Sequence, residues 1–236
     1  MHLSSLSNLS CRATVSSRLE PSLSYVVPLF IVLIVSLSVH EAAHAWMADR
    51  LGDPTARQLG RLTLNPLSHI DWIGTVLFPL VAIYSGLPLI GWAKPVPVNW
   101  NNLRSPRRDF AVVALAGPVS NVLLALGAVV VLLGLVFAAR NGTDFLPMVS
   151  LSLVERFIYL NVFLAVFNML PVPPLDGGNV LAGFVPESMA RLIDSVRPFG
   201  ILILYALMFM GVLNTISRPV YSAVDSLLTG ALRLMS

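Results

Sequence analysis

Two histidines and a glutamate in the run His40-Glu41-Ala42-Ala43-His44 have the residue types and the spacing of a catalytic metal site. On an α-helix, residues four apart lie one turn apart on the same face, so His40 and His44 can bind one metal ion. Two imidazoles joined by a carboxylate suit zinc. Glu41 is adjacent and could take a proton from a water that the metal activates. The run therefore predicts a zinc-dependent hydrolase with Glu41 as general base.

The position of this run in the chain supports that interpretation. Residues 25–39 are almost all apolar, and the helical pattern continues to about residue 49, where Leu51-Gly52-Asp53-Pro54 ends it. At about 1.5 Å per residue, His40 lies about 22 Å along the helix from Tyr25. Ionisable residues at such depth in a membrane are costly and mark functional sites. The alternative, a chance match on a solvated helix surface, fits an apolar helix poorly.

A catalytic zinc site also needs a third protein ligand and one open position. His2 lies in a polar N-terminal segment and His69 near a predicted membrane surface, so neither is favoured. Asp176 follows an apolar helix that breaks at Pro171, and irregular backbone at membrane depth is tolerated where it lines a cavity. Taken alone, Asp176-Gly177-Gly178 indicates an ordinary turn at a helix end. Its pairing with the histidine run favours Asp176 as the third ligand.

These motifs together resemble those of the site-2 protease family of intramembrane zinc metalloproteases. Besides the histidine run, the resemblance rests on Ala116-Gly117-Pro118-Val119-Ser120-Asn121, Asn168-Met169-Leu170-Pro171 and Leu175-Asp176-Gly177, and it covers roughly residues 25–217. Segment 65–108, which contains Gly91-Trp92-Ala93-Lys94-Pro95-Val96-Pro97, is similar to a compact bacterial and archaeal branch. Many relatives carry a PDZ or CBS domain, and none fits here. Substrate recognition would then be intrinsic or supplied by a partner, such as an adaptor or a second copy of the chain.

The resemblance implies one zinc ion bound by His40, His44 and Asp176, with Glu41 as the catalytic base. It also implies a transmembrane protein as substrate, cut within or near the bilayer of a bacterial or archaeal cell. In the family, the asparagine of the N-x-x-P segment lies beside the active site, so Asn168 is a candidate for positioning the substrate or the tetrahedral intermediate. A helix-packing hydrogen bond would explain Asn168 nearly as well.

The composition places the chain among polytopic α-helical membrane proteins. Of 236 residues, 56% are hydrophobic and only 11% are charged, against about a quarter in soluble proteins. The mean hydropathy is +0.80. Several apolar runs approach the roughly 20 residues that cross the hydrocarbon core of a bilayer. The net charge of +3 is spread over short loops and gives no support to nucleic-acid binding, and the one cysteine, Cys11, excludes a disulfide framework within the chain.

We expect an all-α fold with three regions. Residues 1–24 are Ser-rich and predict a disordered tail, or less strongly a transit peptide; residues 25–217 form the membrane-embedded core; residues 218–236 form a C-terminal surface helix or tail. Within the core, 110–139, 151–170 and 199–216 are further spans. The short alternation in 55–72 predicts a small surface strand or hairpin. The Gly- and Pro-rich stretch 73–92 predicts a re-entrant segment.

The predicted zinc ligands constrain the topology. The histidines lie toward the C-terminal end of the first helix and Asp176 follows the C-terminal end of helix 151–170, so these two helices should run parallel. Only one crossing, 110–139, then separates them, and 73–92 must enter and return. This arrangement places nine Lys and Arg residues on the zinc side and six on the other. The excess predicts a cytoplasmic zinc side, four full spans and both termini outside.

Two other functions compete with proteolysis. A zinc transporter also places His and acidic residues in membrane helices, but it needs polar residues along a pathway, and 110–139 and 199–216 offer almost none. His69 and Asp71 are expected to form interfacial hydrogen bonds rather than a second ligand set. A catalytically inactive scaffold is disfavoured because Glu41 accompanies all three candidate ligands.

Overall fold

The computed structural model describes residues 23–85, 91–141 and 148–234, and these residues form helices and connecting loops without a strand. The predicted tail of residues 1–24 falls almost entirely outside this part of the chain. The long helices are α2 (Leu23–Arg50), α5 (Pro106–Arg140), α6 (Met148–Asn168) and α10 (Val212–Leu234). Shorter ones are α3 (Thr55–Gln58), α4 (Phe78–Ser85), α7 (Asp176–Phe184), α8 (Glu187–Val196) and α9 (Gly200–Phe209).

Four segments in this part of the chain are long and apolar enough to cross a membrane: Val26–Arg50, Pro106–Ala138, Leu151–Asn168 and Glu187–Phe209. Their outer surfaces carry many exposed large apolar side chains, as lipid-facing helices require. The protein is therefore an all-α polytopic membrane protein, and the predicted fold class is confirmed.

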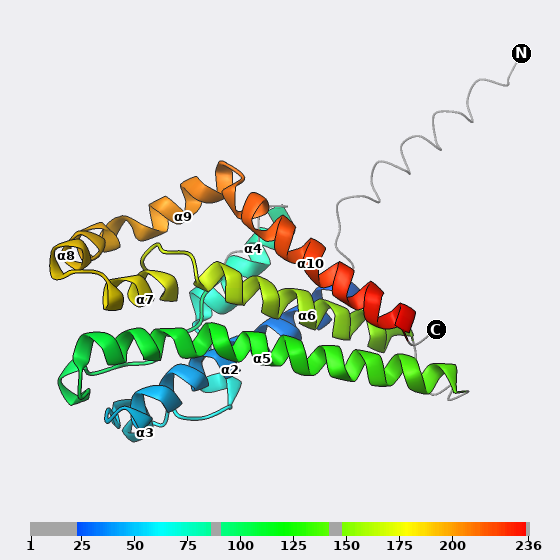
Figure 1. Ribbon diagram of the computed structural model, residues 1–236, viewed down its shortest axis with the longest axis horizontal. Coiled ribbons are helices and arrows are strands. Elements are labelled where there is room, and N and C mark those ends of the chain that lie inside the picture. Colours follow the sequence, from blue (N-terminus) through cyan, green and yellow to red (C-terminus); the bar gives the residue numbers. More distant parts are fainter. Residues whose placement is uncertain (1–22, 86–90, 142–147, 235–236) are drawn as a thin grey trace, which may run out of the picture.

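Helices α2, α5 and α6 pack together and form the core (Figure 1). Along α2, Ser36 contacts Asn161 of α6, and the next turn, at His40, contacts Asp176 beyond the end of α6. Residue numbers thus rise together along α2 and α6, which run parallel. His40 contacts Asn121 and His44 contacts Val113, so α5 runs antiparallel to α2. The helix directions predicted from the ligand positions are confirmed.

Residues 73–92 leave the core and return to the point where they began. The segment opens with a π-helical stretch, Trp72–Leu77, and continues as α4. The amide of Trp92 donates to the carbonyl of Gly74 at 3.1 Å, and the hydroxyl of Thr75 donates to the carbonyl of Trp92 at 2.7 Å. Because both ends lie side by side, the segment enters and returns, as predicted. Residues 86–90 lie outside the described part.

The predicted strand or hairpin in residues 55–72 is wrong. Residues Thr55–Gln58 form the single turn α3, and Pro66–Ser68 form a 3₁₀ turn that Asn65 caps through its side chain. The apolar–polar alternation that suggested a strand has another cause, since Arg61 turns inward and donates to the carbonyls of Lys94 and Pro95. Four or five alternating residues do not define a strand without a partner to pair with.

The predicted last span, 199–216, has different bounds in the structure. Helix α9 ends at Phe209, and Gly211 adopts a left-handed conformation with φ of 73° before α10 begins at Val212. A glycine in this conformation is the usual way to end a helix. Helix α10 then runs back along α6 (Figure 1), and Leu228 packs into a buried cluster with Leu132 and Ile158.

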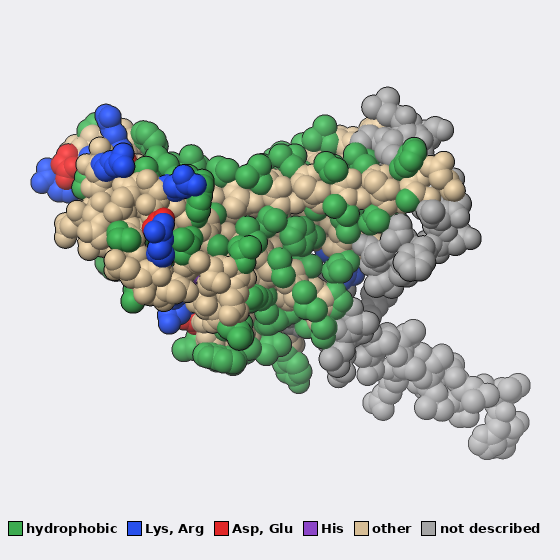
Figure 2. Space-filling view, turned by 90° about the horizontal axis from the view of Figure 1, so that it is seen from below, with side chains coloured by type: hydrophobic (Ala, Val, Ile, Leu, Met, Phe, Trp, Pro, Cys, Tyr) green, Lys and Arg blue, Asp and Glu red, His purple; other side chains and the backbone are tan. Residues whose placement is uncertain are grey.

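Charged side chains gather at one end of the molecule. Figure 2 shows Lys, Arg, Asp and Glu concentrated at the end where Figure 1 places α3 and α8, whereas most of the coloured side chains visible elsewhere are apolar. The C-terminal end of α2 and the N-terminal end of α5 lie at this end too (Figure 1). The candidate ligands of α2 therefore face the charged end of the protein.

Candidate metal centre

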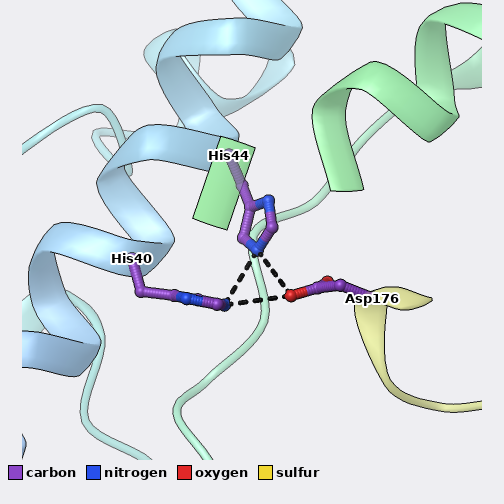
Figure 3. A group of neighbouring side chains, drawn as sticks. All are labelled: His40, His44 and Asp176. Atoms are coloured by element: carbon purple, nitrogen blue, oxygen red, sulfur yellow. Dashed lines mark hydrogen bonds and ion pairs between the residues drawn. The ribbon is translucent and has the colours of Figure 1, made fainter. Parts of the chain in front are cut away.

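Three predicted ligands meet at one point between α2 and the start of α7 (Figure 3). The Nε2 atoms of His40 and His44 are 3.0 Å apart. The Oδ2 atom of Asp176 lies 3.1 Å from the first and 3.4 Å from the second. Both histidines are buried, with exposed fractions of 4% and 8%. The structure thus brings together residues that the sequence separates widely.

The orientation of His44 shows which of its ring nitrogens faces the centre with a lone pair. Its Nδ1 atom lies 2.7 Å from the backbone carbonyl of Val113. A carbonyl oxygen can only accept a hydrogen bond, so Nδ1 carries the proton. Nε2 of the neutral ring therefore directs a lone pair at His40 and at the carboxylate of Asp176. Metal-binding histidines are typically held through their other ring nitrogen in this way.

The geometry of the three atoms fits a zinc ion. Zinc–ligand distances of about 2.0–2.1 Å with tetrahedral angles give ligand atoms about 3.3 Å apart, close to the three separations observed. Oδ2 of Asp176 is buried and accepts no hydrogen bond from the described residues. A buried carboxylate oxygen needs a positive partner. The carboxylate of Asp176 is therefore suited to bind a cation.

Gly117 of α5 gives the two imidazoles their space. A Cβ atom built on this residue would lie 2.4 Å from Nε2 of His44 and 2.5 Å from Cε1 of His40. Any side chain here would displace the rings. The requirement for glycine explains part of the segment Ala116-Gly117-Pro118-Val119-Ser120-Asn121, whose role the sequence alone left open.

Two further glycines place Asp176. Gly177 and Gly178 lie in the first turn of α7. A Cβ atom built on Gly177 would lie 2.4 Å from the carbonyl oxygen of Leu170, and one built on Gly178 would lie 2.7 Å from the backbone nitrogen of Pro173. The first turn of α7 can therefore fold tightly against the end of α6. This close approach brings the Asp176 carboxylate back toward α2. In the Asp-Gly-Gly sequence, the aspartate is the candidate ligand and the two glycines allow the close packing that positions it.

Glu41 is buried beside the ligands and meets the loop that follows the re-entrant segment. Its Oε2 atom accepts a hydrogen bond of 3.1 Å from the amide of Val96. Pro95 and Pro97 flank Val96 and have no amide hydrogen, so Val96 supplies the one backbone donor of this tripeptide. The loop thus holds the candidate base at the metal centre.

Buried polar residues hold that loop in place. Asp53 is completely buried and accepts hydrogen bonds from the amide of Asn99 at 2.7 Å and the side chain of Asn102 at 2.8 Å. His69 and Asp71 also form hydrogen bonds, to the carbonyl of Thr63 and from the amides of Ile73 and Gly74. These contacts agree with the hydrogen-bonding role predicted for both residues.

Asn168 lies at the C-terminal end of α6, and its side chain donates to the carbonyl of Leu164 at 3.0 Å. This hydrogen bond lies within α6 and does not join two helices, so it is not the helix-packing contact named as the alternative, and the role of Asn168 stays a prediction. Sequence reasoning missed Asn161 as a site residue and did not connect Asn121 to the ligands. Both are fully buried, and Asn121 contacts His40 directly. An asparagine inside a long apolar span is the signal that could have identified each of them.

The chain is similar to known proteins over most of its length. It is 40% identical to YwhC of Bacillus subtilis over 78% of this chain and 81% of that protein. It is 33% identical to Rip2 of Mycolicibacterium smegmatis over 81% of this chain and 71% of that protein. Both names place these relatives among the zinc metalloproteases.

The model of peptidase family M50 matches residues 134–211, which include Asp176. No solved structure matches the chain significantly. The similarity to the two relatives extends well beyond residues 134–211, over about four fifths of the chain. The chain belongs to peptidase family M50, the site-2 protease family of zinc metalloproteases.

Proposed function

We propose that this protein is an intramembrane endopeptidase that hydrolyses peptide bonds within or near transmembrane helices of other membrane proteins. The observation that carries the proposal is the convergence of His40, His44 and Asp176 with Glu41 beside them, on a helix that is long and apolar enough to cross a membrane. A substrate that reaches these residues must approach through the same apolar surroundings. A transmembrane helix is the peptide that does so without a large desolvation cost.

The chemistry follows from the side chains around this point. A zinc ion bound by the three ligands would polarise the scissile carbonyl and acidify the attacking water. Glu41 takes one proton from that water, whose oxygen forms a bond to the carbonyl carbon. As the carbon–nitrogen bond breaks, Glu41 delivers the proton to the leaving amine. The amide of Val96 keeps the Glu41 carboxylate oriented for both transfers.

An apolar cavity beside the motif supports a transmembrane substrate. It has a volume of about 560 Å³ and lies between α2 and α5. Its lining includes Ala42 and Ala43 of the histidine run, Ala116 beside Gly117, and Leu62 and Leu64 of the surface loop. An apolar chain could pack there within reach of the metal centre. We propose that Asn168, at the end of α6 that precedes Asp176, positions the substrate or the tetrahedral intermediate.

The zinc centre is proposed to face the cytoplasm. The loops and helix ends that the predicted topology puts on the side of the centre carry nine of the fifteen Lys and Arg residues. Figure 2 shows Lys and Arg side chains gathered mainly at one end of the visible face, and positive residues are more frequent in cytoplasmic loops. Cysteine labelling of Ser105→Cys, on the loop before α5, with a membrane-impermeant reagent in intact cells tests the orientation, in a Cys11→Ser background so that residue 105 carries the one thiol. We expect residue 105 to be labelled only after cell lysis. Labelling in intact cells would mean that the zinc centre faces the outside of the cell.

Reconstitution tests the activity itself. The purified protein is placed in vesicles with single-span membrane proteins that contain helix-breaking residues, and products are mapped by mass spectrometry. We expect cuts within or beside the apolar segment, their loss with a zinc chelator and their return with zinc. Cuts confined to soluble loops would contradict the intramembrane proposal and leave the family assignment intact.

A further inference from the structure

A row of three buried polar side chains extends from His40 away from the metal centre. Asn121 of α5, Asn161 of α6 and Ser36 of α2 each have an exposed fraction of 0%. His40 Nδ1 lies 2.6 Å from Asn121 Oδ1, Asn121 Nδ2 lies 2.9 Å from Asn161 Oδ1, and Asn161 Nδ2 lies 2.9 Å from Ser36 Oγ. Polar groups inside a membrane bundle are costly, and such a row calls for a function.

The backbone carbonyl of Phe157 determines which group donates and which accepts in the hydrogen bonds from Asn161 to Asn121 and His40. Asn161 Nδ2 also lies 2.9 Å from the carbonyl of Phe157, which can only accept, so the amide nitrogen of Asn161 must face it. Asn161 Oδ1 is then the atom that faces Asn121, and it accepts from Asn121 Nδ2. The remaining oxygen of Asn121 faces His40.

The neutral, metal-binding ring of His40 therefore has one possible tautomer. Since Asn121 presents an acceptor, Nδ1 of this ring must carry the proton and donate it. Nε2 keeps its lone pair, which faces His44 and Asp176. If Asn121 turned its amide over, it would present a donor to His40, and its oxygen would meet the oxygen of Asn161. The contact with Asn161 prevents this.

We propose that Asn121 and Asn161 are positioning residues that hold His40 in its metal-binding tautomer, an inference that rests on the proposed zinc centre. Asn121 accepts the Nδ1 proton, and Asn161 fixes the orientation of Asn121. The two ligands on α2 are held differently, because His44 donates to a backbone carbonyl that no side-chain substitution removes. A substitution of Asn121 therefore removes the partner of His40 and leaves the hydrogen bond of His44 to Val113 in place.

Zinc affinity of the full-length protein in detergent, measured by competition with a chelating dye, tests the inference. Asn121→Leu removes the acceptor at similar volume, and we expect about 10- to 100-fold weaker binding. Asn121→Asp keeps an acceptor toward His40 but turns an oxygen toward Asn161 Oδ1, so it should bind zinc more weakly than wild type and more tightly than Asn121→Leu. Cobalt absorption spectra should change in Asn121→Leu and be retained in Asn121→Asp.

Ser38→Ala is the matched control, because Ser38 is also buried in α2 but bonds only to the carbonyl of Ile34 in its own helix. Its zinc affinity should equal that of wild type. If Asn121→Leu does not fold, Asn161→Leu replaces it, with a smaller loss in the same direction.

The order of affinities separates positioning from a purely structural role. A role in helix packing alone predicts that Asn121→Asp, which buries a charge, binds zinc no better than Asn121→Leu; that result would overturn the inference. Wild-type affinity in Asn121→Leu would overturn it too. A wild-type protein that binds no zinc would instead refute the proposed metal centre, so the two failures are distinguishable.

Discussion

His40 Nε2 lies 3.1 Å from Oδ2 of Asp176, although Asp176 opens a helix that follows the third long helix of the chain. The parallel packing of α2 and α6 makes this contact possible, and the tight turn at Gly177 and Gly178 completes it. The contact depends on the whole helix core. It therefore links the fold to the metal centre.

Asp176→Asn should abolish most zinc binding. The amide keeps the shape of the side chain but has no negative charge to neutralise the cation. We therefore expect at least about 100-fold weaker affinity, which exceeds the usual effect of losing a residue that only hydrogen-bonds to a ligand. Dye competition measures it. Asp194→Asn, an exposed residue of α8 that pairs with Arg197, is the control and should bind normally. Equal affinity in both variants would remove Asp176 from the ligand set.

Gly117→Ala should weaken zinc binding without weakening the helix. Alanine favours a helix by about 1 kcal/mol over glycine, but its Cβ would clash with both imidazoles. Gly127→Ala is a matched control in the same helix, because nothing lies within 4 Å of its Cβ. We expect Gly127→Ala to keep or raise thermal stability and to keep zinc, and Gly117→Ala to lose zinc because the rings are displaced. Normal zinc content in Gly117→Ala would contradict the packing described here.

Val96→Pro should impair catalysis while leaving the metal in place. Proline removes the amide that holds Glu41, and the flanking prolines already favour the extended backbone that proline needs. A misplaced base typically reduces kcat about 10- to 100-fold. Val96→Ala keeps the amide and should have near-normal kcat. Zinc content should be unchanged in both variants, and normal kcat in Val96→Pro would show that the amide is unimportant.

Asp53→Asn should loosen the loop that carries Val96. Burial raises the pKa of Asp53, but hydrogen bonds from Thr55, Asn102 and Asn99 outweigh it, so the pKa lies below its ordinary value of 3.8. Replacing one carboxylate oxygen by an amide donor leaves one of these donors unpaired, at a cost of about 1–3 kcal/mol.

The effect of Asp53 should depend on pH. A carboxyl group with a lowered pKa in the folded state adds stability above its unfolded pKa of about 3.9, and this stability is lost as the pH falls through the folded value. Thermal unfolding should therefore separate wild type from Asp53→Asn at pH 7. The difference should shrink below about pH 4. A difference that grows in acid would contradict this role.

Much of this fold can be predicted from the sequence, because long apolar runs indicate membrane spans and ionisable residues inside them are energetically costly. The long apolar runs predicted the spans, and His40, His44 and Asp176 were expected together because ionisable groups in such surroundings need a partner. The requirement that these three meet also predicted the parallel helices and the returning segment.

Other features depended on contacts between distant segments. The alternation around Arg61 resembled a strand, but its cause is a hydrogen bond to the carbonyl of Lys94. Gly211 ends α9 by its backbone conformation, which glycine permits without requiring it. Asn161 and Val96 act through partners on other elements, and no local pattern shows which partners these are.

Glu41→Gln tests the central claim most directly. Glutamine keeps the size and hydrogen-bonding oxygen of the side chain but cannot take a proton from water. Wild type and variant are reconstituted with the same membrane substrate, and zinc content and cleavage are measured on each preparation, with Glu155→Gln as a remote control. The account predicts one zinc per chain in all three proteins and cleavage by wild type and Glu155→Gln only. Cleavage by Glu41→Gln at the wild-type rate would contradict it.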